Sequence, residues 1–177
     1  MNVTLGSLYE STGDKAKAIQ YYEKAISIDP DLAAAKNNLA YLLADSSQSL
    51  DRALDLAQEA KALLPDNPNA ADTLGWVLFR KGVPGAAIGY LKEAESGSPP
   101  GEEGLGVIRH HLAQAYEANN ELERAKEALE RALADLDTLK KKAEERGATL
   151  KEPSWVADVR AMLERLKQGA LAAPGPS

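Results

Sequence analysis

The sequence predicts an all-α fold, a right-handed superhelical solenoid of antiparallel helix hairpins, from three observations. One pattern of large and small residues recurs four times, and its leading leucines step by 34, 35 and 38 residues. Alanine and leucine are abundant while aromatic residues make up 5% of the chain, which favours close-packed helices over strands. The apolar residues of each copy follow helical spacing, so each copy would bury its apolar face by stacking on its neighbours.

The four copies place the same residue types in the same order. They are Leu5, Gly6, Tyr9, Gly13, Ala18, Tyr22, Ala25, Pro30; Leu39, Ala40, Leu43, Ala53, Ala57, Ala60, Pro65; Leu74, Gly75, Leu78, Gly82, Ala87, Leu91, Ala94, Pro99; and Leu112, Ala113, Tyr116, Ala125, Leu129, Ala132. The second copy has one extra residue in its turn, around 46–49, and the fourth copy lacks the closing proline.

This pattern predicts two helices in each copy. Leu, a small residue and a large residue three positions later mark one face of the first helix, and the small residue allows a partner helix to approach closely. Ala, a large residue and Ala at spacings of four and three form the packing stripe of the second helix, which proline ends. Asp31, Asn67 and Asn69 are placed to cap the helix that follows. The predicted helices span residues 1–12, 15–28, 32–45, 50–63, 69–81, 84–95, 106–118, 121–146 and 154–168.

The repeated residues resemble the tetratricopeptide repeat (TPR) family over roughly residues 1–137. The resemblance implies one TPR domain over 1–168, with units near 1–32, 33–67, 68–101 and 106–146 and a capping helix at 154–168. We expect the Ala-, Pro- and Gly-rich tail at 169–177 to be disordered. The segment 72–82, DTLGWVLFRKG, resembles bacterial repeat proteins, some of which are periplasmic or lipid-anchored parts of secretion and polysaccharide-export systems.

Composition disfavours several classes of function. The net charge is −6 and no basic cluster is present, so neither nucleic acid nor an anionic membrane surface is an expected partner. The chain has no cysteine, which excludes disulfides and cysteine-ligated zinc. No apolar run approaches the ~20 residues of a membrane span. We expect no cofactor.

Two segments depart from the simple repeat. The glycine-rich stretch 96–106 follows no strand and lacks a suitably placed Lys, so it is interpreted as a loop between repeats and not as a phosphate-binding loop. From Leu122 to Ala143 the apolar residues follow a heptad pattern over the extended helix of the fourth unit. This helix either packs against the capping helix of its own chain or forms a homodimer.

The resemblance also implies a concave groove lined by the first helix of each hairpin. Its rule for groove positions gives the candidate partner-binding residues Asn37, Asn38, Tyr41, Asp72, Thr73, Trp76, Arg80, His110, His111 and Gln114. The same rule also gives Val3, Thr4, Ser7, Glu10, Ser11, Ala44, Asp45, Phe79, Glu117 and Ala118.

Aromatic anchors beside an arginine are common at interaction hot spots, and amides can pair with a bound backbone. We therefore expect Tyr41, Trp76 and Arg80 to centre the surface. Alternatively, Trp76 fills space against Tyr41, and Arg80 is a solvated charge near a helix C-terminus. Relatives that clamp a chaperone's C-terminal carboxylate carry Lys, Asn and Arg on the groove; only Asn38 matches, so that role is not expected.

The sequence offers no arrangement for catalysis. His110 and His111 are adjacent, so on a helix they point about 100° apart and do not converge on one metal ion. The carboxylates are scattered over solvent faces, and no nucleophile lies beside a base. We expect the chain not to be an enzyme.

The leading functional hypothesis is a protein-interaction module that binds a peptide or partner protein in the groove as a scaffold or adaptor. The alternative is a structural protein that self-assembles through the 122–143 heptad helix within a bacterial envelope or secretion complex; a regulatory enzyme ranks far below both. Because Leu5 comes too early for a complete first hairpin, we expect the chain to be a fragment. The compartment, cytoplasmic or periplasmic, stays open.

Overall fold

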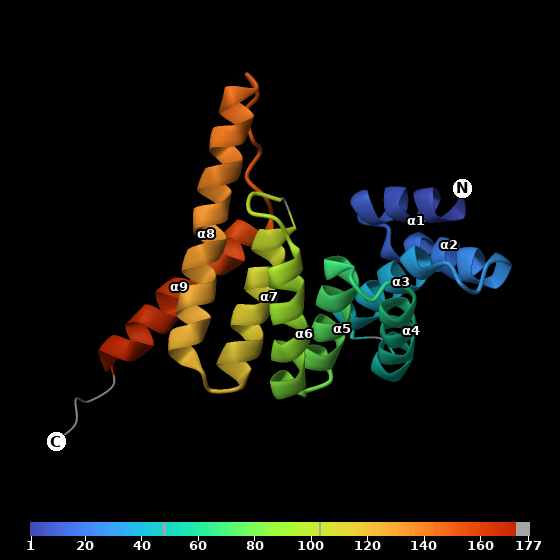
Figure 1. The fold of residues 1–177 in the computed structure, drawn as a ribbon, viewed down its shortest axis with the longest axis horizontal. Helices are drawn as coiled ribbons and strands as arrows, with labels where there is room; N and C mark the ends of the chain where they lie inside the picture. The colour runs from blue at the N-terminus through green and yellow to red at the C-terminus, as the bar shows by residue number, and fades with distance from the viewer. Residues whose placement is uncertain (48, 103, 173–177) are drawn as a thin grey trace. The chain divides into compact units, whose positions relative to one another are not determined.

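The computed structural model describes residues 1–47, 49–102 and 104–172, and within them it is built of helices joined by short turns (Figure 1). The prediction of an all-α repeat fold is confirmed. Over these residues the helices are α1 (Asn2–Ser11), α2 (Lys15–Ile28), α3 (Ala33–Asp45), α4 (Leu50–Leu63), α5 (Pro68–Arg80), α6 (Pro84–Gly97), α7 (Leu105–Ala118), α8 (Leu122–Glu145) and α9 (Trp155–Ala172). None of these helices is at once long and apolar enough to cross a membrane.

The chain divides into two compact units, which are described separately. Unit 1, Met1–Gly97, contains α1 to α6, and unit 2, from Ser98 onward, contains α7 to α9. In unit 1 the consecutive helices α1 and α2, α3 and α4, and α5 and α6 form hairpins. The hairpins stack in chain order, because α2 packs on α3, and α5 packs on both α3 and α4.

Glycine in the first helix of a hairpin lets the second helix approach closely. A Cβ atom on Gly6 would lie 2.5 Å from the Tyr22 ring, and one on Gly75 would lie 2.7 Å from Cγ of Leu91. Tyr22 and Leu91 are fully buried, so neither can swing away into solvent. This is the physical reason for the glycine after the leading leucine in the first and third repeats.

Ion pairs connect successive hairpins of unit 1 at its surface. Arg52 of α4 pairs with Glu23 of α2 at 2.7 Å, and Lys61 of α4 pairs with Glu93 of α6 at 2.5 Å. Such exposed pairs contribute on the order of 0–1 kcal/mol each. They help to set the register of the stack, while the buried alanines and leucines provide most of its stability.

Two of the turns contain a residue that caps the following helix, and the turn with the extra residue is strained. Asn67 caps α5 through its side-chain oxygen, which accepts from the backbone N–H groups of residues 69 and 70, so the prediction for Asn67 is confirmed. The prediction is wrong for Asp31 and Asn69. The residue before α3 is Leu32, with no side-chain cap, and Asn69 already lies inside α5.

Asp14 caps α2, where its side chain accepts from the backbone N–H of Lys17. In the turn with the extra residue, Ser47 and Ser49 adopt φ angles of 54° and 48°, a region that non-glycine residues occupy rarely. The insertion is thus absorbed in the turn, and the helices on either side keep their register.

In unit 2, α7 and α8 form a hairpin and α9 packs against both helices. Figure 1 shows that α8 runs well past the end of α7 before the chain turns back toward α9. The heptad residues Leu129 and Leu136 are buried inside the unit, as are Val156 and Val159 of α9. The intramolecular alternative for the heptad pattern is therefore the packing observed.

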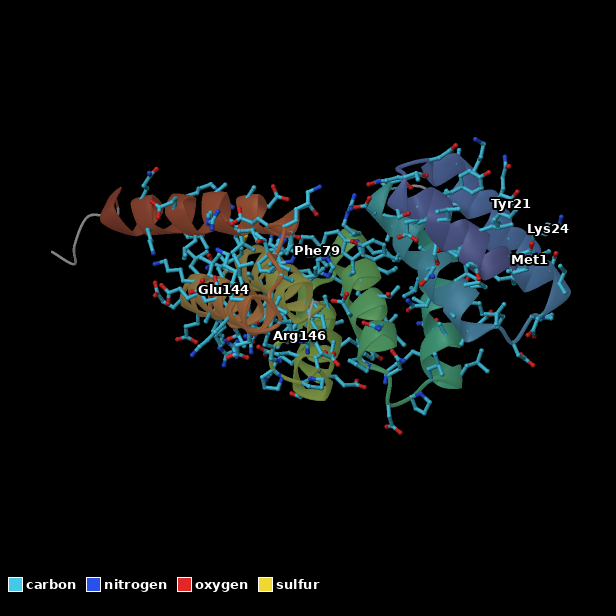
Figure 2. All side chains as sticks on the ribbon, turned by 90° about the horizontal axis from the view of Figure 1, so that it is seen from above. Met1, Tyr21, Lys24, Phe79, Glu144 and Arg146 are labelled. Carbon is cyan, nitrogen blue, oxygen red and sulfur yellow. The ribbon has the colours of Figure 1, made fainter. Side chains whose placement is uncertain are left out.

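The tip of α8 carries exposed charges, among them Glu144 and Arg146 (Figure 2). The last helix, α9, continues to Ala172, four residues beyond the predicted end, because Ala170, Leu171 and Ala172 are good helix formers. The disorder expected for 169–177 is therefore not found over 169–172, and residues 173–177 lie outside the described part of the chain.

Candidate functional site

The candidate residues of unit 1 lie on α1, α3 and α5, the first helix of each hairpin. We define the inner surface of unit 1 as Ser7, Glu10, Asn37, Asn38, Tyr41, Asp45, Asp72, Thr73, Trp76 and Arg80. Helices α3 and α5 pack directly on each other. Helix α1 is connected to α3 through the side chain of Tyr22, which reaches between them from α2.

The hydroxyl of Tyr22 is the hub of a hydrogen-bond network beneath this surface. It donates to Oε2 of Glu10 at 2.8 Å and accepts from Nδ2 of Asn38 at 3.1 Å, while Oγ of Ser7 lies 3.1 Å away. Because the hydroxyl proton goes to the carboxylate, Ser7 is left to donate. Burial of the ring is the main cause of a raised pKa for Tyr22. The network fixes three predicted groove residues, Ser7, Glu10 and Asn38, relative to one another.

Tyr41 lies half-buried at the centre of the inner surface. Its pKa is raised to about 12, first because the ring is buried and then because the carboxylates of Asp45, Asp72 and Glu10 lie nearby. Arg80 acts in the opposite direction. Carboxylates therefore outnumber cations around this hydroxyl, which stays protonated at neutral pH and can donate a hydrogen bond.

Arg80 is held in place by the end of α3. Its Nη1 donates to the backbone carbonyl of Asp45 at 3.2 Å and its Nη2 donates to the Ser47 hydroxyl at 2.5 Å. The guanidinium carbon lies 5.2 Å from the centre of the Trp76 ring, within the range of a cation–π contact. Arg80 is thus not the freely solvated charge of the alternative interpretation.

The remaining unit 1 candidates differ in their exposure. Asn37 is half-buried; its Oδ1 is shielded from solvent and has no hydrogen-bond partner among the described residues, and its Nδ2 reaches Oδ1 of Asn38 only at 3.5 Å. Thr73 and Trp76 are 3% and 7% exposed, and Asp72 is also buried. Trp76 stacks on Phe79 of its own helix, with ring centres 5.3 Å apart. Trp76 therefore supports the surface from within and presents little of its own ring.

In unit 2 the predicted histidines are buried on α7. His110 is 8% exposed and His111 is 4% exposed. Burial lowers the pKa of His110 to about 4, helped by the neighbouring His111 and opposed by Asp158 of α9. The neutral imidazole accepts from Nε2 of Gln114, 3.1 Å from Nε2 of His110, which places its own proton on Nδ1.

Helix α9 closes one side of α7. The indole of Trp155 sits so near Gly106 that a Cβ atom there would clash with the ring. Near the other end, Arg165 forms a two-bond ion pair with Glu117, another predicted groove residue. The histidine candidates of unit 2 are therefore buried to about the same extent as Thr73 and Trp76 of unit 1.

The sequence does not predict two features of the candidate site in unit 1. Tyr22 was assigned to the packing stripe alone, although a tyrosine at a fully buried position needs partners for its hydroxyl, and that requirement was a usable signal. Nothing in the sequence indicates the contact of Arg80 with the Asp45 carbonyl, because this contact depends on how the turn with the extra residue folds. Only structure could locate it.

Comparisons with known proteins show similarity to one family of repeat proteins. The family model described as tetratricopeptide repeat matches residues 1–32 and 108–134. A TPR repeat-containing protein of Pseudomonas aeruginosa is 35% identical over 91 residues, which is 51% of this chain and 15% of that protein. The matched segment is therefore a small part of that much longer relative.

Solved structures share the fold at low sequence identity. A thermophilic TPR protein of Thermus thermophilus has a TM-score of 0.73 and 19% identity, over 96% of this chain and 81% of that one. The protein MamA has a TM-score of 0.58 and 18% identity, over 94% of this chain and 95% of its own. At these identities the likeness shows the fold alone.

Proposed function

We propose that the inner surface of unit 1 binds a peptide segment of a partner protein, because the chain has a tetratricopeptide-type repeat fold, which generally serves as a non-catalytic scaffold for protein interactions. The observation that carries the proposal is the arrangement around Tyr41: a protonated hydroxyl between the Asn37 amide and the fixed guanidinium of Arg80.

Three properties of this arrangement suit an extended peptide. The Nδ2 of Asn37 makes only one long hydrogen bond within the fold, at 3.5 Å to Asn38, so it can donate to a C=O of a bound backbone. Arg80 is ordered before any ligand arrives, so less side-chain entropy is lost on binding. The excess of carboxylates near Tyr41 favours ligands that bring N–H donors or cationic side chains.

The Tyr22 network supports the surface from below. It ties α1 to α3 through Glu10 and Asn38, so the two helices cannot shift independently under a ligand. Binding groups that are held by packing and by supporting hydrogen bonds are pre-positioned for a ligand. Self-assembly through the heptad helix would have to use its ends, since Leu129 and Leu136 are buried within unit 2 whereas Leu122 is 43% exposed.

A peptide-library selection tests the proposal. Random twelve-residue peptides are selected on the immobilised chain, and the enriched sequences are synthesised and titrated by calorimetry. Tyr41→Ala and Asn37→Ala should weaken binding by about tenfold or more, the loss typical of hot-spot residues. Lys92→Ala, at an exposed position of α6, should leave the affinity unchanged. Equal binding by wild type and Tyr41→Ala, with folding verified by circular dichroism, would refute the proposed site.

A further inference from the structure

A second polar hollow lies on the first hairpin, away from the inner surface. We define the tyrosine–lysine hollow as Tyr9 of α1 and Lys17, Gln20, Tyr21 and Lys24 of α2, which line it together. The four α2 residues are spaced three and four apart and share one face of the helix. Ala18, Tyr22 and Ala25 form the opposite, buried face. Figure 2 shows Tyr21 and Lys24 side by side along α2 at the edge of unit 1.

The two tyrosines give the hollow a rigid aromatic wall. Their rings stack with centres 5.3 Å apart and planes within 12°. The ammonium of Lys17 lies 5.0 Å from the centre of the Tyr9 ring, which orders the lysine against the wall. The wall therefore exists before any ligand binds.

The charge of the hollow is positive although the chain as a whole carries −6. Its lining contains two lysines and no carboxylate. Lys17 is paired with Asp14 just outside the lining, at 2.8 Å. Within the part of the chain that the structure describes, Lys24 has no ion-pair partner. The neighbouring Glu23, by contrast, is paired with Arg52 of the next hairpin.

We propose that the tyrosine–lysine hollow binds an acidic peptide segment of a partner protein, through its Asp or Glu side chains. One carboxylate pairs with the Lys24 ammonium, and the adjacent ligand backbone lies against the Tyr9–Tyr21 wall. The Gln20 amide and the tyrosine hydroxyls supply further donors to carboxylate oxygens. Charge complementarity selects this occupant, because a basic or neutral segment would leave Lys24 uncompensated. The site is separate from the inner surface of unit 1, whose carboxylates would repel the same ligand.

The experiment is a titration of the ¹⁵N-labelled full chain with N-acetylated, C-amidated hexaglutamate, which has no terminal carboxylate. Amide shifts should cluster at residues 9 and 17–24. Lys24→Glu should weaken the binding about fivefold or more, since it replaces a favourable ion pair with a repulsive one. Tyr21→Ala should also weaken it. The matched control is Lys92→Glu, the same charge change at an exposed lysine of α6, which should leave the affinity within a factor of two.

Four results would overturn the inference. The first is amide shifts at Tyr41 or Arg80 in place of α2, and the second is equal weakening of binding by Lys24→Glu and Lys92→Glu. The third is binding of hexalysine with equal affinity. The fourth is light scattering that shows a dimer abolished by Lys24→Glu, which would make a second copy of the chain the occupant. Spectra of each variant verify its fold. Because the shifts identify the surface, failure here is distinguishable from failure of the inner surface to bind peptides.

Discussion

Substitution of Gly75 by alanine tests the idea that a missing side chain sets the distance between α5 and α6. The new Cβ would lie 2.7 Å from Cγ of Leu91 and 3.2 Å from the carbonyl oxygen of Ala87. Leu91 is fully buried, so the strain cannot be relieved by moving it into solvent. Overpacking of this kind costs about 1–3 kcal/mol, against a gain of ~1 kcal/mol in helix propensity. The difference is a net loss of about 0–2 kcal/mol in the free energy of unfolding, and the 2.7 Å approach to a buried side chain favours the upper end of that range.

Gly89 provides the matched control on the partner helix. It is exposed within α6, and no heavy atom would lie within 4 Å of a Cβ placed there. Gly89→Ala should therefore stabilise the protein by ~0.5–1 kcal/mol. Urea unfolding followed by circular dichroism at 222 nm measures both changes.

The two substitutions are chemically identical, so their opposite signs would isolate the packing effect. If Gly75→Ala proved as stable as Gly89→Ala, the close approach of α5 and α6 would not be what requires glycine. An unchanged denaturant slope is the control that the unfolded states are comparable.

Three further predictions concern the packing and the polar network. Tyr22→Phe should destabilise the chain by about 2 kcal/mol in urea unfolding, because it removes a buried hydroxyl with a charged partner. The control Tyr21→Phe should change stability by less than ~0.5 kcal/mol. Equal effects of the two substitutions would contradict the hydrogen-bond network around Tyr22. The pKa of His110 is lowered from 6.5 to about 4, so the unfolded chain binds more protons between these values and stability decreases as the pH is lowered through that window. Wild type should lose about 1–2 kcal/mol from this group between pH 7 and 5, and a His110→Gln variant that loses as much would refute the assignment. Leu163→Ala should lower the free energy of unfolding by about 2–4 kcal/mol because it opens a cavity under α9, while Glu164→Ala, at the exposed neighbouring position, should be nearly neutral. Hydrogen exchange of the amides of α9 measures both effects. Equal exchange in the two variants would contradict the packing of α9.

Most of the fold could be predicted from local patterns. Every predicted helix is present, and the ends agree within four residues, because leucine, alanine and proline positions report packing and termination directly. The cap predicted at Asp31 was wrong because α3 begins one residue later, directly after Leu32. Asp31 donates its own backbone N–H to the side chain of Asp29, and α3 starts without a side-chain cap.

The candidate site was less predictable than the fold. The positions of Tyr41 and Asn37 follow from repeat register, which a sequence contains. The exposure of each side chain depends on neighbours outside the repeat, as Ala44 illustrates, since it is fully buried at a position expected to line the groove. The packing of α9 against α7 includes an ion pair between Arg165 and Glu117, residues 48 apart, and no local pattern encodes such a contact.

The two tryptophans of the chain are divided between the units, Trp76 in unit 1 and Trp155 in unit 2, and both rings are almost wholly shielded from water. Each half of the molecule thus contains its own intrinsic fluorophore, whose emission moves to longer wavelength when water reaches the ring. Selective excitation in single-tryptophan variants can therefore report whether the halves melt together or one after the other, without any attached dye.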